Sequence, residues 1–269
     1  MKNRITARFR ALKARGQRAF IAYITAGDPD LSATRDMVTE LERSGVDIVE
    51  LGIPFSDPIA DGPTIQAASH RALRKGASLS RIFGMVASLR KVTDIPIVFM
   101  TYYNPVLAYG LRRFVADCRR KGVDGVIVPD LPFEEATELV KAARAVGLAT
   151  IQLVAPTSTG ERIKEIARRS TGFIYYVSLT GVTGARKGVP KDLAARVKAI
   201  KSVSKSPVSV GFGVATQEQA RAIAKVADGV IVGSAIVKII ERNRKDRKGL
   251  LSRVSKFAGS LARAVHGVR

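Results

Sequence analysis

The segment VDIVELGIPFSDPIADGP, residues 46–63, joins a strand-like run to a polar loop. Its first seven residues are mostly apolar and include the β-branched Val46, Ile48 and Val49, which is typical of a parallel strand that is covered on both faces. Glu50 lies near the end of this run, and the loop that follows carries Asp57 and Asp61 among three prolines. Acidic residues are scarce in this chain, so three of them beside an apolar strand point to a functional site.

Seven similar runs occur elsewhere, and helical patterns such as 30–45 and 132–147, each ending at a glycine, lie between them. The eight strand-like runs are AFIAYIT (19–25), VDIVELG (46–52), IPIVFMT (95–101), VDGVIVP (123–129), LATIQLV (148–154), GFIYYVS (172–178), SPVSVGF (206–212) and ADGVIVG (227–233). Eight such units favour a (β/α)8 TIM barrel over the competing doubly wound open sheet. We expect one domain over residues 1–269, with extra helices at Ile5–Arg15 and in the second and eighth βα connections.

The composition is typical of a cytoplasmic protein. The single cysteine, Cys118, excludes an internal disulfide framework and suits a reducing compartment. No apolar run approaches the roughly 20 residues of a membrane span. The basic N-terminus lacks the apolar core of a secretory signal.

The net charge is unusual, with 45 Lys and Arg against 23 Asp and Glu, or +22. Such a surface attracts anions, including RNA, in a salt-dependent manner. Because no aromatic residues interleave the basic runs, we expect a solvated cationic surface and only non-specific nucleic-acid binding.

In such barrels the chemistry takes place at the carboxyl ends of the strands. Two glycine-bearing turns, 210–216 and 232–238, follow the seventh and eighth strands, where barrels often bind phosphate through backbone N–H groups and a short helix. Ser234 would begin that helix, and the glycine-rich loop 179–188 could close over the same group. The alternative is that these glycines only permit tight turns. The pattern predicts a phosphate ester as substrate.

The sequence lacks the residues that several kinds of catalysis require. The two histidines, His70 and His266, stand in helical, basic surroundings typical of the surface, so we expect neither a metal site nor a Ser-His-Asp triad. No lysine falls at a strand end for a Schiff base, and no GxGxxG motif follows the first strand. Acid–base chemistry by Glu50 and Asp61 remains, and apolar neighbours should raise the pKa of Glu50. The alternatives are an arginine salt bridge for Glu50 and turn or cap roles for the aspartates.

At these residues the sequence resembles the family of tryptophan synthase α subunits. The matching segments cover essentially the whole chain in order: FIAYITAGDPD (20–30), VELGIPFSDPIADGPTIQ (49–66), MTYYNPV (100–106), GVDGVIVPDLPFEE (122–135), APTS (155–158), YYVSLTGVTGAR (175–186), VGFGVAT (210–216) and GSAIVKIIE (233–241). The segment around Glu50 and Asp61 is highly specific to the family.

The resemblance implies a lyase of L-tryptophan biosynthesis that cleaves indole-3-glycerol phosphate to indole and glyceraldehyde 3-phosphate. It implies that Glu50 protonates indole C3 and removes the proton of the glycerol hydroxyl, while Asp61 accepts a hydrogen bond from the indole N–H. The loops 54–63 and 179–188 resemble mobile lids.

Other positions are assigned by the same resemblance. The substrate would be bound by Tyr103, Tyr175, Thr183 and Phe212, with Phe20 or Ile21 and Leu131 also enclosing the indole. The phosphate would be bound by Gly184, Gly213, Gly233 and Ser234. The partner subunit would be contacted by Asp57 and Pro58.

The partner implied is the tryptophan synthase β subunit, in an αββα heterotetramer. Pyridoxal phosphate (PLP) belongs to that partner, and no cofactor is expected in this chain. A charge of +22 departs from the family and would slow association with a like-charged partner. Two alternatives stay open: a free-standing indole-3-glycerol phosphate lyase, and a basic barrel that serves only as a binding module.

Overall fold

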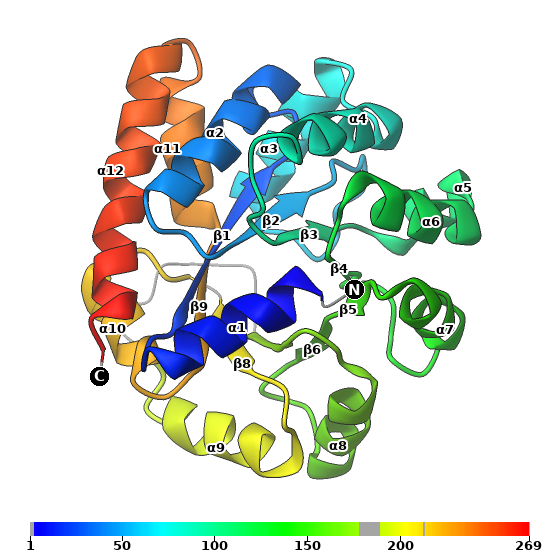
Figure 1. Cartoon of the computed structure of the whole chain (residues 1–269), viewed down its shortest axis with the longest axis vertical. Coiled ribbons are helices and arrows are strands. Elements are labelled where there is room, and N and C mark those ends of the chain that lie inside the picture. The colour runs from blue at the N-terminus through cyan, green and yellow to red at the C-terminus, as the bar shows by residue number, and fades with distance from the viewer. Residues whose placement is uncertain (1–2, 178–188, 212, 269) are drawn as a thin grey trace.

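The computed structural model describes residues 3–177, 189–211 and 213–268, and its strands form one parallel sheet (Figure 1). The strands are β1 (Ala19–Thr25), β2 (Ile48–Gly52), β3 (Ile97–Met100), β4 (Gly125–Ile127), β5 (Ala149–Thr150), β6 (Gln152–Val154), β7 (Ile174–Val177), β8 (Val208–Gly211) and β9 (Gly229–Val232). Only Ile151 separates β5, which pairs with β4, from β6, which pairs with β7. The two segments are halves of one strand with a neighbour on each side. Eight strands therefore close into a barrel, as predicted.

The helices surround this barrel. They are α1 (Arg4–Ala14), α2 (Leu31–Arg43), α3 (Pro63–Arg74), α4 (Leu79–Leu89), α5 (Tyr103–Tyr109), α6 (Leu111–Lys121), α7 (Thr137–Val146), α8 (Gly160–Arg169), α9 (Leu193–Val203), α10 (Gln217–Ala224), α11 (Ser234–Asn243) and α12 (Arg247–His266). The three extra helices predicted from the sequence are confirmed: α1 precedes β1, two helices follow β2, and two follow β9. None of the described helices is long and apolar enough to cross a membrane.

Two helices depart from the predicted pattern. The third connection contains α5 as well as α6, and the local signals for α5 are Pro105 in its first turn and Gly110, with φ of 89°, directly after it. The pattern at 132–147 predicts a helix from its start, but α7 begins at Thr137. There the Pro132 carbonyl accepts the N–H groups of residues 135 and 136 in a turn instead.

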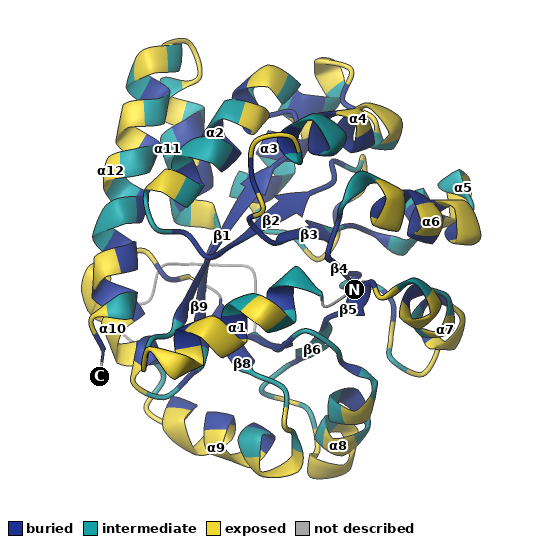
Figure 2. Cartoon of the chain, viewed as in Figure 1, coloured by how far each residue is buried: buried dark blue, intermediate teal, exposed yellow. Residues whose placement is uncertain are grey.

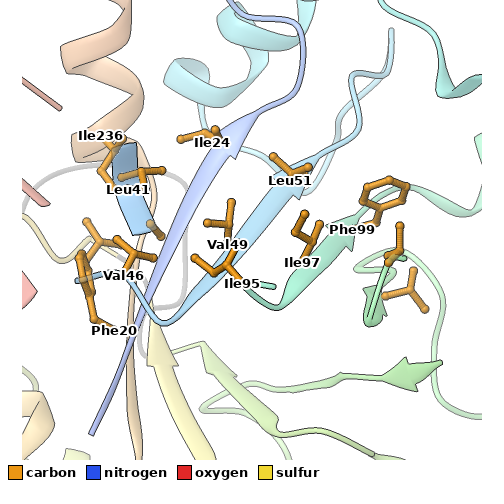
Figure 3. Close-up of a cluster of buried hydrophobic side chains, with 14 of the residues drawn as sticks. Phe20, Ile24, Leu41, Val46, Val49, Leu51, Ile95, Ile97, Phe99 and Ile236 are labelled. Atoms are coloured by element: carbon orange, nitrogen blue, oxygen red, sulfur yellow. The ribbon is translucent and has the colours of Figure 1, made fainter. Parts of the chain in front are cut away.

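Alternation along each strand divides the core into two parts. Outward-facing side chains such as Phe20 and Ile24 pack against the helices together with Leu41 of α2 and Ile236 of α11 (Figure 3). Inward-facing side chains such as Ile21 fill the barrel. The strands are accordingly buried on both faces, while the helices expose only their outer sides (Figure 2).

Helix α1 closes one end of the barrel. It lies across the strands (Figure 1) and packs Ile5 and Phe9 against the side chains at the beginnings of the strands, with the rings of Phe9 and Phe173 5.8 Å apart. This is the amino-terminal end of the strands. In the part of the chain that the structure describes, α1 therefore leaves the opposite, carboxyl end as the entrance for a substrate.

Three aspartates stabilise the closed end. Asp47, Asp124 and Asp228 each immediately precede a strand and accept a backbone N–H of a neighbouring strand at 2.8–3.0 Å. Nε2 of His266 also lies 2.8 Å from Asp47, so this histidine contacts the barrel rather than being a mere surface residue. These carboxylates have structural partners, which leaves the acids at the other end as candidates for chemistry.

Candidate active site

Four titratable side chains meet at the carboxyl end of the barrel. Tyr23 of β1 and Glu50 of β2 are register partners, Tyr175 comes from β7, and Asp61 comes from the loop that follows β2. Burial raises the pKa of both phenols, and the charges of the two carboxylates raise it further. The fold thus brings together three of the predicted site residues, Glu50, Asp61 and Tyr175, from separate parts of the sequence. Tyr23, which was not predicted, lies with them.

Glu50 is a buried acid, and no ion pair to it is formed by the described residues. Only 1% of the residue is exposed, and within the described residues neither carboxyl oxygen has a hydrogen-bond partner. The alternative of an arginine salt bridge is therefore wrong for the described part of the chain. Burial alone raises the pKa of Glu50 from 4.5 to about 8, so the side chain is mostly protonated at pH 7.

Asp61 lies in a more polar environment. The Tyr102 hydroxyl donates a hydrogen bond to its Oδ2 at 3.0 Å and itself accepts the Ala60 N–H at 3.0 Å. Gln66 Nε2 donates to the Asp61 carbonyl at 2.9 Å, which anchors the loop to α3. Burial raises the pKa of Asp61 to about 6, and the Tyr102 hydrogen bond opposes that rise. At pH 7 the site therefore holds one protonated and one ionised carboxyl group.

Two glycines make room for the tyrosine rings. A Cβ at Gly52 would overlap the Tyr23 hydroxyl, and one at Gly211 would overlap the Tyr175 hydroxyl. Each phenol therefore lies directly on the backbone of a neighbouring strand. The close approach explains why both rings fit within the barrel, where the charge of the buried Glu50 acts on both phenols.

The aromatic residues nearest the carboxylates differ from those expected. Tyr102 contacts Asp61, whereas Tyr103 donates its N–H to both Oδ atoms of Asp130, at 3.0 and 3.1 Å, and packs its ring against the outer core. Phe20 faces the helices, whereas Ile21 lies inside the barrel, in the same cluster as Tyr175 and two residues deeper than Tyr23.

Leu131, which was also expected to enclose the indole, packs in the outer core. The residues that sequence reasoning missed are Tyr23 and Tyr102. The signal for Tyr23 was its place two residues beyond Ile21 on the same face of the strand.

The predicted phosphate site lies beside Tyr23. Helix α11 begins at Ser234, and Gly233 at its N-cap supplies no side chain, so the first N–H groups of the helix have no side-chain cap. A Cβ at Gly233 would lie 3.3 Å from the Cβ of Tyr23. Gly213, with φ of 76°, follows β8.

Thr183, Gly184 and Phe212 lie outside the described residues. Their predicted contacts with substrate and phosphate stay predictions.

The surface around Asp61 carries exposed apolar side chains. Ile59 is 79% exposed in the same loop, and Leu107 is 53% exposed on α5. Tyr102 joins these two segments, because its hydroxyl contacts the loop and its ring lies 5.4 Å from that of Phe55. Asp57 is exposed beside Ile59, whereas Pro58 is buried.

Comparison with known proteins places this chain in a family. The family model described as tryptophan synthase alpha chain matches residues 9–266. The tryptophan synthase alpha chain of Citrifermentans bemidjiense is 51% identical over 263 residues, which are 98% of each chain. The crystal structure of tryptophan synthase subunit alpha from Legionella pneumophila superposes with a TM-score of 0.91 at 36% identity, over 98% of this chain and 99% of that one. A chain of the tryptophan synthase a2b2 complex from Pyrococcus furiosus gives 0.84 at 42% identity, over 91% and 98%. This chain, with its two carboxylates at the open end of the barrel, belongs to the tryptophan synthase alpha chain family.

Proposed function

We propose that Glu50 and Asp61 carry out the cleavage of indole-3-glycerol phosphate to indole and glyceraldehyde 3-phosphate, the step that this family performs in tryptophan biosynthesis. The observation that carries the proposal is the pair of carboxyl groups at the open end of the barrel. Their pKa values of about 8 and about 6 make one an acid and the other a base at neutral pH.

The first step is protonation of the indole ring. Protonated Glu50 gives its proton to C3, and the positive charge that results spreads to the ring nitrogen. Ionised Asp61 accepts a hydrogen bond from the indole N–H and stabilises that charge. A fixed anion in a partly buried site does this better than water, because it needs no reorganisation during the reaction.

The second step breaks the carbon–carbon bond. Glu50, now a carboxylate, removes the proton from the hydroxyl on the carbon attached to C3. The electron pair of that O–H bond forms the C=O bond of the aldehyde, the carbon–carbon bond to C3 breaks, and the electrons of the broken bond return to the ring and neutralise it. Glu50 ends protonated, as it began, so the cycle needs no electron acceptor other than the indole itself.

The remaining parts of the site position the substrate. The N-terminus of α11, with Gly233 and Ser234, would bind the phosphate, together with Gly213 and Gly184. Tyr175, Phe212 and Thr183 would enclose the indole and glycerol parts, whereas the ring of Tyr103 packs against the outer core.

A partner subunit is the second part of the proposal. The exposed apolar side chains of Ile59 and Leu107, next to Asp57 and Pro58, suit docking of a β subunit beside the lid loop. PLP would belong to that subunit, and the steps above use no cofactor in this chain. We place the assembly in the cytoplasm, where the single cysteine stays reduced.

Release of indole from indole-3-glycerol phosphate tests this proposal. We expect slow release by the chain alone and strong stimulation by a tryptophan synthase β subunit, because docking beside the loop 54–62 would hold Asp61 in place. Fast turnover without β would identify a free-standing lyase. A folded chain that releases no indole under either condition would contradict both enzyme functions and leave the basic surface as the functional element.

Tyr102→Phe provides a pH test of Asp61. The hydroxyl lowers the pKa of Asp61, so its removal should raise that pKa further above 6. Because Asp61 acts ionised, the acid limb of the pH profile of kcat/KM should then move to higher pH, with the alkaline limb unchanged. Steady-state rates between pH 5 and 9 measure both limbs. An unmoved acid limb would mean that this limb belongs to another group.

A further inference from the structure

Glu50 must be stabilised in two charge states, because the proposed cycle passes through its carboxylate. Burial stabilises the neutral, protonated form of the Glu50 carboxyl group. The structure shows no donor bonded to the carboxyl within the described residues, so the ionised state needs a hydrogen-bond donor that is close by and free to turn toward it.

The neighbours of Glu50 leave few candidates for that donor. One step deeper in the barrel, Ile21 of β1 and Ile48 of β2 are apolar, and so is Val98, the register partner on β3. On the open side, the titratable groups of the described residues on which the charge of Glu50 acts are the phenols of Tyr23 and Tyr175, and Asp61 acts on the same two phenols. Of these described titratable groups, the two phenols are the hydrogen-bond donors.

Tyr23 is the phenol attached to the strand next to Glu50. The two residues are register partners, and neighbouring strands lie about 4.8 Å apart. The Tyr23 hydroxyl lies over Gly52, which is on the same face of β2 as Glu50 and two residues closer to the open end. Since Gly52 has no side chain, nothing on β2 stands between the carboxyl group and the hydroxyl.

The existing contact of the Tyr23 hydroxyl is weak. Its oxygen lies 3.4 Å from Oγ1 of Thr25, at the long limit for an O–H···O hydrogen bond. Burial, together with the charges of Asp61 and Glu50, raises the pKa of Tyr23 well above its usual value, so the phenol keeps its proton. The phenol is therefore a hydrogen-bond donor that would give up only this weak contact on turning to another acceptor.

We infer that Tyr23 is a positioning residue for Glu50. The hydroxyl of Tyr23 donates a hydrogen bond to the Glu50 carboxylate once Glu50 has given its proton to the substrate. This inference rests on the proposed function of Glu50. The donor stabilises the intermediate charge state, while the Tyr23 ring, together with that of Tyr175, keeps water away from the neutral state. The same side chain thus serves both halves of the cycle.

Tyr23→Phe tests the inference, because it keeps the ring and removes only the hydroxyl. Loss of a hydrogen bond to a charged group should lower kcat about 10-fold to 100-fold, with KM within about twofold. The ionised form of Glu50 also loses its donor, so the pKa of Glu50 should rise, and the alkaline limb of kcat/KM should move up by about one pH unit. A titration of 13C-labelled glutamate by NMR, without substrate, should show the same rise.

The matched control is Tyr176→Phe, which removes the hydroxyl of a buried tyrosine on the outward face of β7. This variant should change neither kcat nor the alkaline limb of the kcat/KM profile. A Tyr23→Phe variant with unchanged kcat and limb would overturn the inference while the proposed function stands. A fall in kcat with an unmoved limb would also overturn it, since Tyr23 would then act on the substrate instead of on Glu50. Failure of the unmodified chain and β subunit to release indole would instead remove the proposed function itself.

Discussion

Glu50→Gln should lower kcat for indole release by about 10³-fold to 10⁴-fold, because one side chain supplies both proton transfers of the proposed cycle. Glutamine has nearly the same shape but can neither give nor take the proton. KM should change little, since the proposed phosphate site lies elsewhere, at the start of α11. Single-turnover assays with the β subunit present measure the chemical step directly.

Loss of activity in this variant must be separated from loss of folding. The pKa of Glu50 is about 8 in the folded protein against 4.5 in the unfolded chain, so folding favours its neutral form. The native chain should therefore lose up to about 5 kcal/mol of stability from this group as the pH rises from 4.5 to above 8. Glu50→Gln does not titrate and should escape that loss.

Urea unfolding at pH 5 and pH 9 tests the direction of this pH dependence of stability. The variant should gain stability relative to the native chain at pH 9 and be close to it at pH 5. Glu165→Gln, on the exposed side of α8, is the control, because its side chain is in contact with solvent. An inactive variant that is destabilised equally at both pH values would show damage to the fold, and the loss of activity would then say nothing about proton transfer.

The barrel could be predicted from the sequence because each strand is buried on both faces. Such strands form short apolar runs that stand out against the amphipathic helices, as at 19–25, where run and strand coincide. Boundaries were less predictable. The run 46–52 includes Asp47, whose side chain accepts a backbone N–H at the closed end, so β2 begins only at Ile48.

The carboxylates could be predicted because the end of a strand is a position that the sequence reveals. The aromatic residues around them could not, because their roles depend on which face of a strand turns inward and on how deep each residue lies. Phe20 faces the helices, and Tyr23 faces Glu50, although only three residues separate them. Likewise, Tyr102 reaches Asp61 and Tyr103 does not, because α5 begins between them, and that helix was not predicted.

Asp61→Asn should lower kcat by about 10²-fold to 10³-fold, because it removes the negative charge that faces the developing positive charge of the indole. The asparagine carbonyl oxygen can still accept the Tyr102 hydrogen bond, so the loop 54–62 should keep its position. The variant should also lose the acid limb of its pH profile near pH 6, because the group that ionises there is gone. Asp94→Asn is the control, since this aspartate is 89% exposed and its ion-pair partner, Arg4, lies on α1 at the closed end of the barrel.

The double variant Tyr102→Phe/Asp61→Asn tests whether these two residues act as one unit. If the phenol works only by holding and ionising Asp61, its removal should change neither kcat nor the pH profile once Asp61 is asparagine. A further fall in kcat would show that Tyr102 contacts the substrate directly. An acid limb that survives in Asp61→Asn would contradict the assignment of that limb to Asp61, and the charge opposite the indole would have to come from another group at the open end of the barrel.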